Sequence, residues 1–343
     1  MAGSRRISVV IPVYNGADTL GGCLEALYAS DCGDFEVIVV DDGSTDATRE
    51  VASRYPCRVV ALPQNVGAAR AKNAGAQEAT GEILFFTDAD VHVRPETLSH
   101  VAEDLQAPEV DGVVGLLAES CPYTNFASRF KNGWMHFTYR RQPSIGSIEG
   151  RPKRVGLFFT SAAAIRRELF LREGGFDSHY SGASITEDIE FGQRLLSHGR
   201  VIIMDKRLTV EHNKRYTAGE VLRTDLLRAR GLAQTWIRNR QSREGRAHYA
   251  SVPWYFGAGV LALGLGTLFL LLGALPGLGW GVALAGACVL AALGLNAPFL
   301  VALRGWYGWR FALLSAGFVL LDLYVSGLGI ALGGCDFLRG ERY

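Results

Sequence analysis

The chain changes character at about Pro253, and this change constrains its fold more than any other feature. Before that point, polar and apolar residues are mixed as in a water-soluble α/β domain. Beyond it charged residues nearly disappear, and Leu, Gly and Ala dominate. A helix that crosses a hydrocarbon core of about 30 Å needs roughly 20 apolar residues. The C-terminal part is therefore expected to form a membrane module.

Three stretches reach this length, at residues 255–275, 278–303 and 311–334. Only Pro276 and Gly277 separate the first two, which predicts a tight helical hairpin. The sequence RGWYGWR that precedes the third stretch has the basic and aromatic character of a membrane boundary. We therefore expect three domains: a soluble domain at 1–215, amphipathic helices and a linker at 216–252, and a membrane domain at 253–343.

Asp322 lies near the middle of the third apolar stretch. An ionised carboxylate there costs at least about 2.5 kcal/mol on insertion scales. Three explanations remain open: protonation, pairing with a polar group such as Asn296, or a segment that does not cross the bilayer.

The charge distribution predicts how the chain is oriented in the membrane. Thirteen Lys or Arg residues against five Asp or Glu residues lie between Arg194 and Arg246, just before the first apolar stretch. Positive charge collects on the cytoplasmic side of membrane proteins, so the soluble part is expected to be cytoplasmic. We expect an integral protein of a bacterial or archaeal plasma membrane. If the third stretch crosses, the C-terminal tail lies outside; if it rests in the interface, the tail stays inside.

The overall composition excludes some classes of partner and of cofactor. The formal net charge of +1 argues against a nucleic-acid partner. The six cysteines form no C-x-x-C pair, which is typical of reduced thiols rather than of a disulfide framework or a zinc site.

In the soluble part, short apolar runs alternate with helical patterns. The apolar runs lie at 7–13, 35–40, 59–62 and 82–86, and the helical patterns lie at 17–29, 46–55 and 66–79. This alternation predicts an α/β fold with a mostly parallel, doubly wound sheet. Ligands of such sheets bind beyond the carboxyl ends of the strands. Polar residues follow three of these ends, at 12–15, 41–46 and 87–90.

The polar strand ends contain candidate metal and phosphate ligands. Asp88 and Asp90 directly follow an apolar strand, and paired carboxylates are suitable ligands for Mg²⁺ or Mn²⁺. A solvated turn would explain the same residues. Asp41 and Asp42 open either a binding loop or a helix-capping turn. Arg70 lies in a glycine-containing helix start, which suits either a phosphate contact or tight helix packing.

Taken together, the motifs resemble those of a known family. They are IPVYN (11–15), VVDDGSTD (39–46), NVGAARAKNAG (65–75), FTDADV (86–91), GGFD (174–177) and TEDIEFGQRL (186–195). In order and spacing this series resembles a family 2 glycosyltransferase of the GT-A fold, over roughly residues 7–216. The resemblance implies a nucleotide-sugar donor, such as a UDP- or GDP-sugar, and inversion at the anomeric carbon.

The resemblance also assigns roles to individual residues. The expected nucleotide-sugar site comprises Pro12, Tyr14, Asn15, Asp41, Asp42, Arg70, Asn73 and Asp88. Asp88 and Asp90 match the family's D-x-D motif, whose Mg²⁺ or Mn²⁺ neutralises the donor diphosphate. Asp188, beside Glu187, matches the base that deprotonates the acceptor hydroxyl; helix-dipole complementation is the alternative. His212 is the candidate third metal ligand, although a surface histidine before a basic run is the other explanation.

The acceptor is expected to come from the membrane. Residues 123–141 and 221–240 have apolar and basic residues at helical spacing, typical of interfacial helices and also of core helices with a basic face. The layout is similar to that of polyprenyl-phosphate glycosyltransferases, which suggests a polyprenyl phosphate or a glycolipid. No Q-x-x-R-W motif precedes the membrane part, which disfavours a processive polysaccharide synthase. A membrane nucleotidyltransferase and a noncatalytic nucleotide-sugar-binding protein are weaker alternatives.

Overall fold

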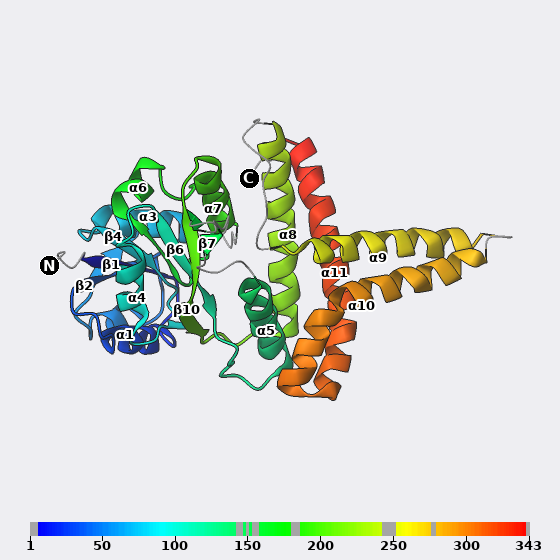
Figure 1. Ribbon diagram of the computed structural model, residues 1–343, viewed down its shortest axis with the longest axis horizontal. Coiled ribbons are helices and arrows are strands. Elements are labelled where there is room, and N and C mark those ends of the chain that lie inside the picture. Colours follow the sequence, from blue (N-terminus) through cyan, green and yellow to red (C-terminus); the bar gives the residue numbers. More distant parts are fainter. Residues whose placement is uncertain are drawn as a thin grey trace. The chain divides into compact units, whose positions relative to one another are not determined.

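The computed structural model describes residues 6–141, 147–148, 151–152, 158–179, 186–241, 252–275 and 279–340. The chain divides into two compact units (Figure 1). The first comprises Met1–Tyr123, Tyr139–Lys214 and Gly245–Ala250. The second comprises Thr124–Thr138, Arg215–Glu244 and Ser251–Tyr343. The second unit thus contains most of the helix at Phe126–Arg140 as well as the C-terminal helices.

The first unit is built on an eight-stranded sheet with the order β3-β2-β1-β4-β9-β6-β10-β5. These strands are β1 (Ile7–Val13), β2 (Phe35–Asp41), β3 (Arg58–Ala61), β4 (Ile83–Phe86), β5 (Val91–His92), β6 (Gly112–Leu117), β9 (Ala163–Arg166) and β10 (Ile202–His212). A separate two-stranded pair joins β7 (Ser147–Ile148) and β8 (Arg151–Pro152). Strands β1, β2 and β4 are fully or largely buried, as their continuous apolar sequences predict.

The sheet is mixed, and most of its pairs are parallel. Strands β3, β2, β1 and β4 run parallel to one another, and β6 runs parallel to β10. Strand β9 lies antiparallel between β4 and β6, and β5 pairs antiparallel with β10. The helices of this unit are α1 (Leu20–Tyr28), α2 (Thr48–Ala52), α3 (Ala68–Glu78), α4 (Thr97–Asp104), α6 (Arg167–Arg172) and α7 (Glu187–Ser197). The predicted fold class is confirmed.

Strand β10 is longer than the short apolar run that indicates it in the sequence. The run at 201–204 is followed by Asp205, Lys206 and Arg207, which interrupt the apolar pattern. In the structure the pairing with β6 shifts register between Met204 and Thr209 and then continues. An irregularity of this kind absorbs extra residues without ending the strand. His212 is therefore the last residue of strand β10.

The second unit consists of α5 (Phe126–Arg140), α8 (Ala218–Gln241), α9 (Trp254–Gly273), α10 (Trp280–Tyr307) and α11 (Trp309–Leu338). The last three are the helices in the described part of the chain that are long and apolar enough to cross a membrane. Their bounds lie within a few residues of the predicted stretches. Helices α10 and α11 meet at Gly308, whose φ of 87° ends the first and begins the second. The predicted link at Pro276 and Gly277 lies outside the described residues.

Asp322 does not face the partner that the sequence suggested. Asn296 donates its amide N–H to the carbonyl of Ala292, one turn earlier in α10, at 2.9 Å. The charged neighbours of Asp322 are Asp225, Lys131 and Arg228, from α8 and α5. The pairing with Asn296 is therefore wrong, because α11 turns the carboxylate toward the amphipathic helices.

Candidate active site

The loops that follow the neighbouring parallel strands β1 and β2 are joined by hydrogen bonds. Asn15 has a φ of 50°, a left-handed backbone conformation that asparagine tolerates better than most residues. Its side-chain oxygen accepts the main-chain N–H of Thr45 at 2.8 Å, and its own N–H donates to Ser44 Oγ at 2.9 Å. Tyr14 beside it is 50% exposed, whereas Pro12 is half-buried. Asn15 thus fixes the loops from which Tyr14 projects.

The Asp41 and Asp42 carboxylates organise the backbone after β2. Asp41 is fully buried, accepts the N–H of Ser44 at 3.0 Å and forms an ion pair with Arg49. Asp42 accepts the N–H groups of Val66 and Gly67, at 2.8 and 2.9 Å, one on each oxygen. Each carboxylate oxygen has two lone pairs, so Asp42 retains acceptor capacity for a ligand hydroxyl or base.

Asp88 lies at the carboxyl end of β4 and is partly exposed. Its Oδ2 accepts a hydrogen bond from Ser161 Oγ at 2.5 Å. The Ser161 carbonyl in turn accepts the Thr87 hydroxyl at 3.0 Å. These bonds tie the D-x-D turn to the segment that leads into β9. Ser161 has no sequence signal, because it lies between elements that only long-range pairing brings together.

Asp90 and His212 are adjacent because β5 pairs with the end of β10. His212 is opposite Val91 in this antiparallel pair, and the main-chain N–H of Asn213 donates to the Asp90 carbonyl at 2.6 Å. The His212 Nε2 and Asp90 Oδ1 atoms are 3.4 Å apart, and Lys214 Nζ is 3.9 Å from Oδ2. Burial raises the pKa of Asp90, but His212 and Lys214 outweigh this effect and hold the pKa below its usual value. Asp90 is therefore an ionised carboxylate.

The arrangement fits a metal ion for which protein side chains supply only some of the ligands. Among the residues that the structure describes, no three His, Cys, Asp or Glu side chains are grouped so that they alone could hold a metal ion. Magnesium is commonly bound by one or two carboxylates, with substrate phosphates and water completing its coordination. The ionised, partly exposed Asp90 beside the imidazole of His212 offers such an incomplete set of ligands.

Lys72, which the sequence did not single out, lies between the two acidic motifs. It is 3% exposed, and its Nζ donates to Thr160 Oγ1 at 2.7 Å and to Glu187 Oε1 at 3.1 Å. Burial lowers its pKa, but the charges of Glu187, Asp88 and Asp188 outweigh burial and raise the pKa above its usual value. Lys72 is therefore a buried cation that faces acidic groups from both motifs. Its position on the small-residue face of α3, with Ala69 and Ala76, was the available signal.

The acidic pair at the start of α7 divides into two environments. Thr186 is the residue before the helix, and its carbonyl accepts the N–H of Glu190 at 2.9 Å. Glu187 is 4% exposed and bound by Lys72, whereas Asp188 is partly exposed. Of the two, Asp188 is the more exposed carboxylate.

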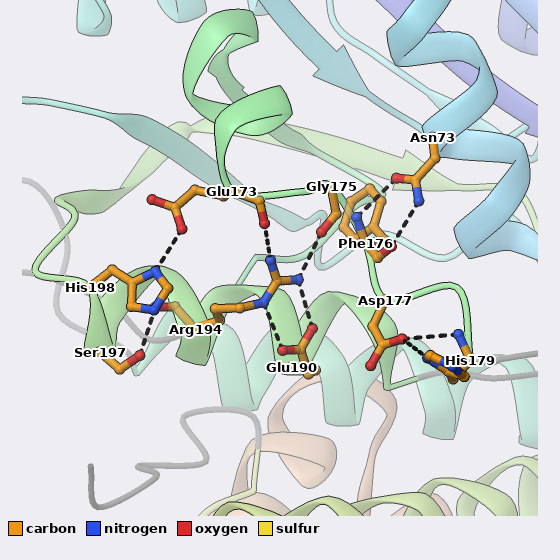
Figure 2. A network of polar contacts seen from close by, with 10 residues as sticks. All are labelled: Asn73, Glu173, Gly175, Phe176, Asp177, His179, Glu190, Arg194, Ser197 and His198. Atoms are coloured by element: carbon orange, nitrogen blue, oxygen red, sulfur yellow. Dashed lines mark hydrogen bonds and ion pairs between the residues drawn. The ribbon is translucent and has the colours of Figure 1, made fainter. Parts of the chain in front are cut away.

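Arg70 and Asn73 hold a protein loop. Arg70 Nε donates to the carbonyl of Ser178 at 3.1 Å. Asn73 forms two hydrogen bonds with the main chain of Phe176, one donated at 2.8 Å and one accepted at 2.9 Å (Figure 2). Gly175 has a φ of 69°, and a Cβ there would lie 2.5 Å from Asn73 Oδ1. The GGFD segment is thus fitted closely against α3.

Arg194 fixes the same loop from the side of α7 (Figure 2). Its guanidinium binds both oxygens of Glu190, at 2.9 and 3.0 Å, one turn earlier in the helix. It also donates to the carbonyls of Gly175, at 2.8 Å, and of Glu173. The Glu173 carboxylate in turn contacts His198 Nδ1 at 2.6 Å. Side chains of α3 and α7 therefore both form hydrogen bonds with the loop at Gly175 and Phe176.

The comparison with known families agrees with this geometry. Residues 8–172 match the family model "Glycosyl transferase family 2". The chain carries a family 2 glycosyltransferase domain. Validoxylamine A glucosyltransferase of Streptomyces hygroscopicus is 32% identical over 221 residues, which are 56% of this chain and 52% of that protein. The chain thus spans about half the length of this relative.

Other relatives match over a larger share of their length. The glycosyltransferase AglE of Haloferax volcanii is 25% identical over 243 residues, covering 69% of this chain and 76% of its own. Among solved structures, the mannosyltransferase PcManGT of Pyrobaculum calidifontis, in complex with GDP-Man and Mn²⁺, matches with a TM-score of 0.57 and 23% identity. That match covers 95% of this chain and 88% of the other. It shows that this chain has the GT-A fold. In the described residues, three helices that are long and apolar enough to cross a membrane follow.

Proposed function

We propose that this protein transfers a sugar from a nucleotide-sugar donor to a lipid acceptor in the membrane, with inversion at the anomeric carbon. The observation that carries this proposal is the position of Lys72. The buried cation is bound to Glu187 and lies in the fields of Asp88 and Asp188, so two acidic motifs a hundred residues apart belong to one site. A donor-side and an acceptor-side carboxylate in one site are what group transfer requires.

The donor is held at the ends of β1, β2 and β4. Tyr14 and Pro12 line the nucleobase side, and Asp42, supported by Asn15 and Asp41, accepts a hydrogen bond from the base or ribose. Asp90, Asp88 and His212 are the residues that would hold Mg²⁺ or Mn²⁺ beside the diphosphate. The cation supplies charge neutralisation for the departing diphosphate. PcManGT in complex with GDP-Man and Mn²⁺ supports a divalent ion without fixing which one is used here.

In the transfer, an acceptor oxygen bonds to the anomeric carbon while the bond from that carbon to the diphosphate breaks. Attack from the face opposite the leaving group inverts the configuration. Asp188 is placed to take the proton of an acceptor hydroxyl. A phosphate acceptor is largely ionised at pH 7, because its second pKa is about 6, and so needs no such base. The presence of a reachable carboxylate at Asp188 is compatible with either acceptor, but only a hydroxyl depends on it.

Arg70 and Asn73 keep the loop before α7 in place, and this positions the acceptor side of the site. The apolar helices α9, α10 and α11 place the chain at a membrane, which favours a polyprenyl phosphate or a glycolipid as acceptor. The basic residues before α9 favour a catalytic unit on the cytoplasmic side.

The test is incubation of purified protein with labelled UDP- and GDP-sugars, membrane lipids and Mg²⁺ or Mn²⁺, followed by extraction into organic solvent. Label in the organic phase is expected, and it should depend on the divalent ion. Label found only in long water-soluble polymer would contradict the lipid acceptor. Neither transfer nor donor hydrolysis across the panel would contradict the enzymatic proposal.

A further inference from the structure

Helix α11 has a polar or small face that is buried and an apolar face that is exposed. The buried residues repeat at helical spacing, and most of them are polar or small: Ser315, Asp322, Ser326, Gly329, Gly333 and Asp336, with Val319 and Leu323 as the two apolar members. The exposed face consists of Leu313, Leu314, Leu321, Leu328 and Leu332. The side of the helix that meets protein is therefore the side that is least suited to lipid.

Amphipathic helices cover this polar face over most of its length. Near the start of α11, Phe126 of α5 packs its ring against those of Phe311 and Phe318, with centroids 5.1 and 5.3 Å apart. Farther along, a Cβ added at Gly329 would lie 2.4 Å from the carbonyl oxygen of Leu226 in α8. The same addition at Gly333 would lie 2.3 Å from that of Arg230. Helices α8 and α11 thus meet backbone to backbone and run side by side (Figure 1).

The covering helices are charged. Lys131 of α5 forms a buried ion pair with Asp225 of α8, next to Asp322. Arg230 of α8 forms an ion pair with Asp336. In the described part of the chain, α5 and α8 are not among the helices apolar enough to cross a membrane. If α11 crossed the bilayer, it would take these charges into the hydrocarbon, where ionisable residues are rare and costly.

Helices α9 and α10 differ from α11 in this respect. Helices α9 and α10 form a hairpin whose far end extends away from α8 and α11 (Figure 1), although Thr267 of α9 still contacts Tyr324 of α11 at 2.8 Å. No charged residue occurs in α9 or in the first 24 residues of α10. The 20 residues of α9 span about 30 Å at 1.5 Å per residue, the thickness of a hydrocarbon core. The 30 residues of α11 span about 45 Å, more than a crossing needs.

We propose that only α9 and α10 cross the membrane, and that α11 lies along one leaflet. Its Leu face rests in the lipid interface, and its polar face binds α5 and α8, as in helices that lie in the plane of a membrane. The chain then crosses twice, and its C-terminus returns to the side of the catalytic unit. The inference rests on the membrane location of the proposed function, but it concerns topology and does not depend on the reaction.

The test uses the full chain in sealed membrane vesicles of known orientation. Single cysteines are introduced into a cysteine-free background at three exposed positions: Glu50 in α2, Gly279 at the tip of the hairpin, and Arg339 just after α11. Gly279 suits this because a Cβ there meets nothing within 4 Å. Each variant is treated with a membrane-impermeant maleimide before and after the vesicles are opened with detergent.

Arg339→Cys and Glu50→Cys are expected to react from the same side, and Gly279→Cys from the opposite side. Reaction of Arg339→Cys from the side of Gly279→Cys would show that α11 crosses and would overturn the inference. Reaction of all three from one side would overturn it too, because the hairpin would then not cross.

A second measurement covers the case in which the cysteine-free chain does not fold. Green fluorescent protein or alkaline phosphatase is fused after Tyr343 of the otherwise unchanged chain. Fluorescence with an inactive phosphatase is expected, since the former folds in the cytoplasm and the latter outside it. With the catalytic unit on the cytoplasmic side, as proposed above, the reverse pattern would overturn the inference. Neither measurement involves sugar transfer, so a failed transfer assay and a failed topology remain distinguishable.

Discussion

Replacing Lys72 by methionine tests the central contact of the site. Methionine has a similar length but no charge, so Lys72→Met leaves the buried carboxyl group of Glu187, which is 4% exposed, without its cation. Removing one partner of a buried pair costs about 3–5 kcal/mol, because the other charge stays buried. For a domain of this size each kcal/mol lowers the melting temperature by about 2–4 °C. The expected loss is therefore roughly 6–20 °C.

Unfolding of the catalytic unit can be followed through Cys23, whose side chain is fully buried in α1. After accessible thiols have been blocked, heating in the presence of a fluorogenic maleimide reports when this thiol is released. The matched control is Lys206→Met, the same substitution at an exposed lysine of β10. Equal melting temperatures for Lys72→Met and Lys206→Met would refute the buried ion pair.

A double variant separates stability from the role of Lys72 in transfer. In Lys72→Met with Glu187→Gln, the uncompensated charge is gone, so at least half of the lost stability should return. Transfer should not return with it, because the ion pair that joins the start of α7 to α3 is then absent. Recovery of both would mean that the pair serves folding alone.

Three further predictions concern single carboxylates. Asp188→Asn should retain donor binding and lower transfer to a hydroxyl acceptor by orders of magnitude, yet lower transfer to a lipid phosphate far less; loss of donor binding would point to a structural role. Asp90→Asn should abolish the metal dependence of donor binding, measured by titration calorimetry with and without Mn²⁺, and unchanged dependence would remove its assignment as a ligand. Burial and the neighbouring Asp205 raise the pKa of Asp104 to about 7. Between the usual pKa and this raised value, the folded state binds a proton that the unfolded state releases. The contribution of Asp104 to stability is therefore greatest below about pH 4 and is lost as the pH rises through 7. The melting temperature should fall from pH 5 to pH 8, and Asp104→Asn should flatten that fall.

The sequence predicted the parts of the fold that depend on local pattern. The buried strands β1, β2 and β4 read as continuous apolar runs, and three C-terminal stretches had the length of membrane helices. Strand β9 could not be predicted in this way, because its place between β4 and β6 arises from pairing over 50 or more residues. The full length of β10 was hidden by the charged residues at its irregularity.

The sequence named candidate site residues but not their environments. Asp42 and Asn73 were expected to face a nucleotide, and each also binds main-chain groups of the protein. Lys72 was overlooked because a lysine on a helix is ordinarily solvated, and only the folded chain shows Glu187 and Thr160 around it. The burial of a side chain and the identity of its hydrogen-bond partners depend on the tertiary structure, so a sequence motif does not predict them.

The two amide hydrogen bonds of Asp42 have a consequence for how the donor and the acceptor bind. They join this carboxylate to Val66 and Gly67, immediately before α3, and α3 carries Lys72 with its bond to Glu187. A ligand that displaces Asp42 therefore displaces a helix that is also bound to Glu187 at the start of α7. By thermodynamic linkage, if bound donor changes the affinity for the acceptor by some factor, bound acceptor changes the affinity for the donor by the same factor. Calorimetry would detect such coupling as an equal change in the affinity for a nucleoside diphosphate when acceptor is bound and in the affinity for acceptor when the nucleoside diphosphate is bound.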